Sequence, residues 1–217
     1  MEFVYLTRHG RTYVNELWSL LSPNSRNLLR GNPHDGISKE QLMGLISDDD
    51  QTERFIARNG VKDSDFPIFP FSLSQYGSVQ ANVLGRYLAS RTDITKGVVP
   101  TKASKRIFRN EQTAKLIQKG MGREFGFYGP DALTEKLGYD YANGSNGDSF
   151  DFIREMMLSL GGYIFVLNGG LLERLVGSCG EDLEFFDNCG LVVLNNNRRR
   201  LSIGQGYLSN EQLKERL

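Results

Sequence analysis

Short apolar runs alternate along this 217-residue chain with stretches of helical periodicity. Each apolar run is brief and continuous, which is typical of a buried strand. The alternation of strands and helices predicts an α/β domain with a largely parallel sheet. Strands are predicted at residues 3–6, 97–101, 163–167 and 191–194, and helices near 39–46, from 74 to 88, near 107–118, from 149 to 160, at 171–176 and after Ser209.

Residues 20–70 interrupt this alternation. They hold four of the six prolines and the acidic run 48–50, and the only helix expected there is the one near 39–46. Since a chain of 217 residues is typical of one domain, we expect a single domain over residues 1–217 with an insertion or lid at about 20–70. A second polar segment, residues 195–200, is expected to be a solvated turn.

The composition excludes several classes of partner. Lys and Arg number 26 against 26 Asp and Glu, so the net charge is zero and no nucleic-acid footprint is expected. No apolar run approaches the ~18 residues of a membrane span, so no membrane partner is expected, and the N-terminus lacks a signal-peptide pattern. The two cysteines, Cys179 and Cys189, rule out a disulfide framework and favour a reduced, cytoplasmic setting.

The two histidines, His9 and His34, limit the chemistry further. A site with three imidazoles is excluded, and two His and two Cys without close spacing argue against zinc, so neither a metal nor a cofactor is expected. Two other phosphatase motifs do not fit. Neither cysteine is followed by Arg six positions later, and Asp48-x-Asp50-x-Thr52 lies in the proline-rich insertion.

Polar residues stand at the ends of two predicted strands. The first strand runs into Arg8-His9-Gly10, and the third runs into Asn168-Gly169. In open α/β sheets, ligands bind at the carboxyl ends of the strands. The helix expected after the third strand would also offer free backbone N–H groups and a positive dipole end to an anion.

Several spaced blocks of residues share the pattern of one family. They are Arg8-His9-Gly10-x-Thr12-x-x-Asn15, the segment from Leu73-Ser74 through Gln80-Ala81 to Gly85, Arg109-x-x-x-Thr113-Ala114, Leu133-Thr134-Glu135, and Phe165-Val166-Leu167-Asn168-Gly169-Gly170. Together and in this order they resemble the histidine phosphatase superfamily, also called phosphoglycerate mutase-like. The resemblance implies a three-layer sandwich with a mostly parallel central sheet flanked by helices.

The resemblance also implies roles for individual residues. His9 would be the nucleophile, since a neutral imidazole nitrogen can attack a phosphoryl group and carry it covalently. Glu135 would protonate the leaving oxygen and then activate water. The negative charge spread over the phosphoryl oxygens requires cationic and neutral donors around it. The residues in that phosphate-binding role would be Arg8, Asn15, Arg109, Asn168 and Gly169.

The chain departs from the family pattern after the third strand. The family places a second histidine where this chain has Asn168. An asparagine donates hydrogen bonds but cannot become cationic, and losing one charged donor commonly costs on the order of 10² to 10³ in rate. The remaining histidine, His34, lies in the insertion, where the family pattern has no catalytic histidine.

Two functions therefore stay open. The first is a phosphomonoester hydrolase of the histidine phosphatase type, slow or altered, that acts through a phosphohistidine at His9. The second is a catalytically degenerate member that binds a phosphorylated ligand or a protein partner without turnover. Under both, the partner is a phosphorylated small molecule or a phosphoprotein. Mutase activity is less well supported, because nothing in the sequence indicates that water is kept out.

Overall fold

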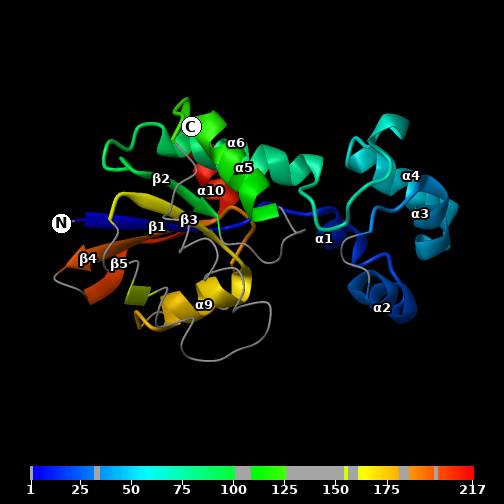
Figure 1. Cartoon of the computed structure of the whole chain (residues 1–217), viewed down its shortest axis with the longest axis horizontal. Helices are drawn as coiled ribbons and strands as arrows, with labels where there is room; N and C mark the ends of the chain where they lie inside the picture. The colour runs from blue at the N-terminus through cyan, green and yellow to red at the C-terminus, as the bar shows by residue number, and fades with distance from the viewer. Residues whose placement is uncertain are drawn as a thin grey trace.

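A five-stranded sheet forms the centre of the molecule (Figure 1). The computed structural model describes residues 2–31, 35–100, 109–125, 154–155, 161–180, 186–197 and 200–217. The strand order is β2-β3-β1-β4-β5. The strands are β1 (Glu2–Arg8), β2 (Gly97–Pro100), β3 (Tyr163–Leu167), β4 (Leu191–Asn197) and β5 (Arg200–Leu208).

The sheet is mostly parallel, as predicted. Strand β3 pairs in parallel with both β1 and β2, while β4 pairs antiparallel with β1 and with β5. Of the five described strands, β4 therefore runs against the other four. The parallel register places Arg8 opposite Leu167, so the carboxyl ends of β1 and β3 lie side by side.

The prediction of a turn at residues 195–200 is wrong for most of that segment. Residues 195–197 continue β4, where Phe3 pairs with Asn195, and Arg200 begins β5. Polar residues fit this strand because pairing on both sides satisfies their backbone groups whatever the side chain. The strand β5 was not predicted, although apolar Leu201 and Ile203 alternate there with polar residues.

Helices cover both faces of the sheet, which confirms the three-layer architecture. On one face, Tyr5, Ile164 and Val193 pack against α5 (Gln75–Leu88), α6 (Arg109–Met121) and α10 (Asn210–Glu215). On the other face, Val4, Phe165 and Leu194 pack against α9 (Gly169–Gly177). Alternate residues of each strand thus enter opposite cores, as the period of two requires. Figure 1 shows α5 and α6 on one side of the sheet and α9 on the other.

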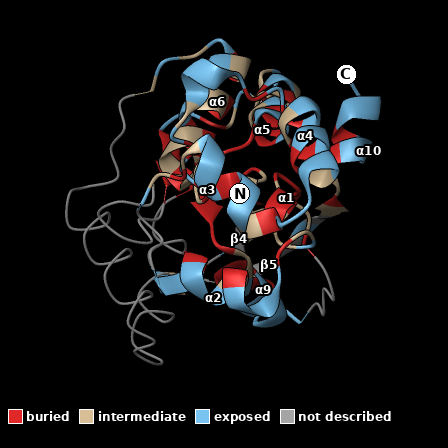
Figure 2. Cartoon of the chain, turned by 90° about the vertical axis from the view of Figure 1, so that its right-hand side faces the viewer, coloured by how far each residue is buried: buried red, intermediate tan, exposed pale blue. Residues whose placement is uncertain are grey.

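Residues 20–70, predicted to be an insertion or lid, carry more helix than the sequence predicted. They follow α1 (Tyr13–Leu17) and contain α2 (Pro23–Gly31), α3 (Lys39–Ile46), α4 (Asp49–Arg58) and the 3-10 turn η1 (Asp63–Asp65). These helices share a separate apolar core that includes Leu17, Leu29, Leu42, Phe55 and Ile68. Figure 2 looks at that end of the molecule and shows exposed residues on the outer sides of α2, α3 and α4.

The predicted starts of three helices are confirmed, and each of these helices has a serine as its N-cap. The side chains of Ser38, Ser74 and Ser209 each accept a hydrogen bond from a backbone N–H in the first turn of α3, α5 and α10. The helix predicted from 149 to 160 falls mainly outside the described residues. No helix in the described part of the chain is long and apolar enough to cross a membrane.

Candidate active site

The loop after β1 begins the candidate site. The backbone N–H of His9 donates to the carbonyl oxygen of Leu167 at 3.2 Å, which joins this loop to the end of β3. From the opposite side, Nδ2 of Asn188 donates to the carbonyl oxygen of His9 at 2.8 Å. The backbone on both sides of the imidazole is therefore fixed by the neighbouring strand end and by the turn before β4.

The His9 side chain is buried, with 5% of its surface exposed. Its Nδ1 lies 2.8 Å from the carbonyl oxygen of Gly10, and because a carbonyl only accepts, Nδ1 carries the proton. Burial lowers the pKa of His9 to about 3, and the positive charges of Arg109 and Arg8 act in the same direction. The ring is thus neutral near pH 7, and the lone pair is on Nε2.

Helices α5 and α6 hold the loop through close backbone contacts. The N–H of Gly10 donates to Oγ1 of Thr113 at 2.9 Å, and that hydroxyl donates to the carbonyl oxygen of Arg109 at 2.7 Å. A Cβ at Gly77 would lie 1.9 Å from the carbonyl oxygen of Arg11. Position 77 therefore has room only for glycine, which explains the glycine and threonine in two of the family blocks.

Arg109 and Asn168 meet across the ends of α6 and β3. Nη2 of Arg109 donates to Oδ1 of Asn168 at 3.0 Å, and 8% of the Asn168 surface is exposed. Asn168 occupies the N-cap of α9, but its side chain does not accept from a backbone N–H of that helix. Because Arg109 occupies the amide oxygen, the first N–H groups of α9 are left for another acceptor.

Arg8 lies beside the N-terminus of α9. Its Nη1 donates to the carbonyl oxygen of Phe186 at 2.8 Å, whereas its buried Nε has no hydrogen-bond partner among the described residues. A Cβ at Gly169 would come within 3.3 Å of that Nε. The glycine therefore keeps open the side of the guanidinium that faces the helix end.

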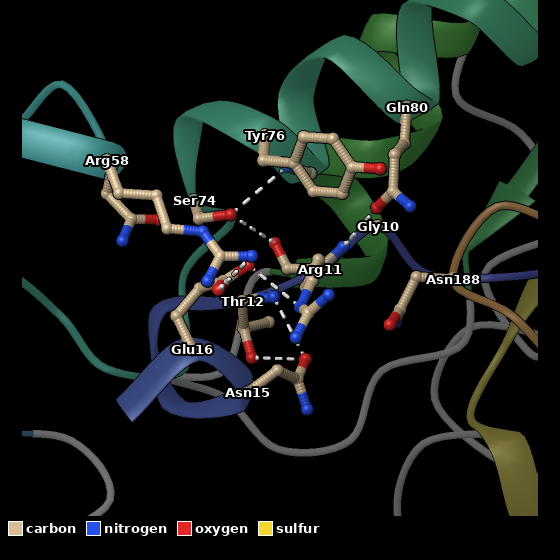
Figure 3. Close-up of polar contacts among 12 residues, drawn as sticks. Gly10, Arg11, Thr12, Asn15, Glu16, Arg58, Ser74, Tyr76, Gln80 and Asn188 are labelled. Carbon is tan, nitrogen blue, oxygen red and sulfur yellow. Dashed lines mark hydrogen bonds and ion pairs between the residues drawn. The ribbon is translucent and has the colours of Figure 1, made fainter. Parts of the chain in front are cut away.

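A cavity of about 370 Å³ opens next to these groups, and both Arg8 and Asn15 line it. Oδ1 of Asn15 accepts from the backbone N–H and the hydroxyl of Thr12, at 3.0 and 2.8 Å (Figure 3). The Nδ2 group of Asn15 remains as a donor for a ligand. The geometry thus supplies arginine, amide and backbone donors around a neutral imidazole, a set suited to an oxyanion.

The structure brings together most of the predicted site residues, but not all of them lie in its described part. Arg8, His9, Arg109, Asn168 and Gly169 gather at the ends of β1 and β3, and Asn15 lines the cavity beside Arg8. The predicted acid, Glu135, and the second histidine, His34, lie outside the described residues.

Two supporting contacts had not been predicted. Asn188 was not predicted as a site residue, and its bond to the His9 backbone requires the fold to bring residues 179 positions apart together. Glu16 was not singled out, yet its buried carboxylate forms an ion pair with Nε of Arg11 at 2.7 Å. In the described ranges, no group of three His, Cys, Asp or Glu side chains is arranged to hold a metal ion.

Comparison with known proteins gives similarity in structure rather than in sequence. No protein-family model matches the chain, and no curated protein sequence matches it. The structure is similar to that of the protein histidine phosphatase SixA in complex with tungstate, with a TM-score of 0.53 and 12% identity over 98% of this chain and 99% of SixA.

Two further solved structures are similar over nearly their whole length. A candidate alpha-ribazole-5'-P phosphatase from Escherichia coli gives a TM-score of 0.54 with 13% identity, covering 97% of this chain and 98% of the other. A candidate phosphohistidine phosphatase SixA from Agrobacterium tumefaciens gives 0.50 with 16% identity, covering 96% and 98%. The chain therefore has the fold of the histidine phosphatase superfamily, the phosphoglycerate mutase-like fold.

Proposed function

We propose that this chain is a phosphomonoester hydrolase of the histidine phosphatase type and that it acts through a phosphohistidine at His9. The observation that carries the proposal is the state of the His9 ring. It is buried and neutral, and Gly10 holds its proton on Nδ1, so the lone pair is on Nε2. A neutral imidazole nitrogen beside two arginines is a suitable nucleophile for a phosphoryl group.

The proposed reaction has two steps. Nε2 of His9 attacks phosphorus, the bond from phosphorus to the ester oxygen breaks, and that oxygen takes the proton of the Glu135 carboxyl group. Water then attacks the phosphohistidine while the Glu135 carboxylate takes its proton, the N–P bond breaks, and inorganic phosphate leaves. The resemblance alone supports the role of Glu135, whereas geometry and resemblance together support His9.

The phosphoryl oxygens are assigned to donors from three elements. Arg8 approaches from the end of β1, Arg109 from the start of α6, and the backbone N–H groups near Gly169 from the start of α9. Asn15 and Asn168 add neutral donors. These groups suit the three equatorial oxygens of a transferring phosphoryl group, because they are mostly cationic or aligned dipoles.

A second function is favoured by one observation, the amide at position 168. With its oxygen engaged by Arg109, Asn168 supplies no positive charge to the transition state. The chain would then bind a phosphorylated small molecule or a phosphoprotein without turning it over. The similar proteins are described as a protein histidine phosphatase and as a candidate ribazole-phosphate phosphatase, and both descriptions imply phosphorylated substrates.

The hydrolysis of an aryl phosphate separates the two functions. We expect the native chain to release phosphate at a measurable rate and His9→Ala to fall to the background rate. His34→Ala is the matched control, because it removes the other histidine and should retain the native rate. Asn168→His is expected to be faster than the native chain.

If the native chain has no His9-dependent rate but Asn168→His gains one, the chain is the degenerate binder. If neither turns over and neither binds inorganic phosphate in a calorimetric titration, the proposed phosphoryl site is wrong.

A further inference from the structure

The cavity extends beyond the groups assigned to the phosphoryl oxygens. Arg8 and Asn15 line one part of it, and the remainder is lined by residues from α5, from α10 and from the turns after β1 and before β4. These residues include Arg11, Tyr76, Gln80, Asn188, Asn210 and Glu211. All six are polar or charged, and Tyr76 contributes the only ring among the described lining residues. Figure 3 shows four of the six, Arg11, Tyr76, Gln80 and Asn188.

Three amide side chains in this wall are each held by one of their two polar ends. Oε1 of Gln80 accepts from the backbone N–H of Arg11 at 3.2 Å. Nδ2 of Asn188 donates to the carbonyl oxygen of His9 at 2.8 Å, and Nδ2 of Asn210 donates to that of Gln80 at 3.1 Å. These bonds fix the amides while leaving Nε2 of Gln80 as a donor and Oδ1 of both asparagines as acceptors.

The free ends of these amides make no hydrogen bond with the described residues. Gln80 and Asn210 are nevertheless largely buried, with 7% and 6% of their surfaces exposed. The free ends of these two amides are not among the buried polar atoms that lack a partner, so they are open to the cavity. The cavity wall therefore offers fixed hydrogen-bond donors and acceptors to which a ligand can bind.

Arg11 is also fixed, because a buried carboxylate holds it. Its Nε lies 2.7 Å from Oε1 of Glu16, whose side chain is 4% exposed, and Nη2 of Arg58 from α4 lies 3.9 Å from the other oxygen (Figure 3). The negative charge of Glu16 offsets that of Arg11. We therefore expect Arg11 to act as a hydrogen-bond donor rather than as a second phosphate site.

Another part of the cavity wall is formed by Tyr76 of α5 and Glu211 of α10. The hydroxyl of Tyr76 donates to Oε1 of Glu211 at 3.4 Å, so an aromatic ring and a carboxylate stand next to each other above the amides. The carboxylate accepts hydrogen bonds, and the ring offers a flat surface to C–H groups. Glu16 already offsets the charge of Arg11. Glu211 and Asp187, which also lines the cavity, add carboxylates, so the part of the ligand that lies beside them is expected to carry no negative charge.

We propose that this cavity is the leaving-group pocket and that it selects small, polyhydroxylated phosphomonoesters such as sugar or polyol phosphates. A hydroxyl group both donates and accepts, so several adjacent hydroxyls match a wall in which donors and acceptors are interspersed. About 370 Å³ lies in the range of small-molecule pockets. The proposal rests on the proposed function, because it takes Arg8 and Asn15 as the phosphoryl end.

The test measures binding in the His9→Ala variant, which removes the nucleophile and prevents turnover. Inorganic phosphate, glucose 6-phosphate, glycerol 3-phosphate and phenyl phosphate are titrated separately by calorimetry. We expect both hydroxylated esters to bind at least about 10-fold more tightly than phenyl phosphate, a difference typical of a few hydrogen bonds. Adding Tyr76→Leu and Glu211→Ala should reduce that preference at least threefold, whereas Val79→Ala, on the exposed face of α5, should leave it unchanged.

The outcomes separate the two proposals. If inorganic phosphate does not bind, both the phosphoryl site and the leaving-group pocket are wrong. If it binds but the four probes bind alike, or if phenyl phosphate or a phosphohistidine peptide binds more tightly than the hydroxylated esters, the leaving-group inference alone is overturned. If the preference exists but survives Tyr76→Leu and Glu211→Ala as it survives Val79→Ala, the preference arises elsewhere and the inference is again overturned.

Discussion

The carboxyl ends of β1 and β3 lie next to each other but carry side chains of different chemistry. At the end of β1, His9 presents a buried neutral ring whose proton is fixed on Nδ1 by the backbone of Gly10. At the end of β3, Asn168 presents an amide whose oxygen accepts from Arg109. The first end holds a group that can form a covalent bond, while the second holds groups that can only bind charge.

This difference suggests that binding and turnover can be separated in this molecule. The proposed oxyanion donors come from both strand ends and from α6, so the affinity for phosphate should depend on both ends together. The proposed nucleophile comes only from the end of β1, and position 168 has no titratable side chain to assist it. A variant at one end should therefore change a different measurable quantity from a variant at the other.

Gly77→Ala should have the largest effect, because it separates α5 from the loop that follows β1. The new methyl group would lie 1.9 Å from the carbonyl oxygen of Arg11, so α5 and the loop must separate, and we expect about 3 kcal/mol loss in the free energy of unfolding measured with urea. Gly44→Ala in α3 is the matched control, because its Cβ would meet no atom within 4 Å. It should gain up to about 1 kcal/mol. Equal effects would show that this backbone contact is unimportant.

Arg109→Ala tests the donor shared by both ends. We expect the dissociation constant for inorganic phosphate to rise about 100-fold, because a charged donor is lost and Asn168 loses its partner. Arg109→Lys should recover only part of the affinity, since an ammonium group lacks the planar fork. Lys119→Ala, an exposed cation on the same helix, is the control for charge alone. A similar loss in both alanine variants would contradict a direct role for Arg109.

The pH dependence of unfolding tests the state of the His9 ring. Its pKa is about 3 in the folded chain, against an ordinary value of 6.5, so the unfolded chain binds more protons between these values. The corresponding stability is present above pH 6.5 and is lost as the pH falls toward 3. We expect the native chain to lose about 3 kcal/mol more than His9→Gln between pH 7 and pH 4, measured by urea unfolding. Parallel curves for the two proteins would contradict a buried neutral ring.

Asn168→Asp tests whether the side chain at the carboxyl end of β3 lines the phosphoryl site. A carboxylate there should form an ion pair with Arg109 and repel an incoming phosphate, so we expect about a 10-fold weaker affinity for inorganic phosphate with unchanged or higher stability. Asn27→Asp on the exposed side of α2 makes the same change in net charge far from the site. If both substitutions leave the affinity unchanged, Asn168 does not line the phosphoryl site.

Sequence reasoning was most successful where the signal was local. A serine at 38, 74 or 209 accepts a bond from an N–H within its own first turn, so the helix starts could be predicted from neighbouring residues. The helices α2 and α4 were not predicted, because each is short and is stabilised by packing against the other insertion helices rather than by a strong pattern of its own.

The sequence by itself determined the kinds of group available: one imidazole at a strand end, arginines at fixed spacing, and an asparagine where the resembling family has a histidine. Only the tertiary structure decided how those groups act. Burial makes the His9 ring neutral, the parallel register places Leu167 opposite Arg8 so that both strands end together, and the packing of α10 on α5 creates the polar wall with Gln80 and Asn210. The physical reason is that pKa values, hydrogen-bond partners and cavities depend on neighbours in space, and such neighbours can be far apart in this chain, as the 183 positions between hydrogen-bonded Thr7 and Gly190 show.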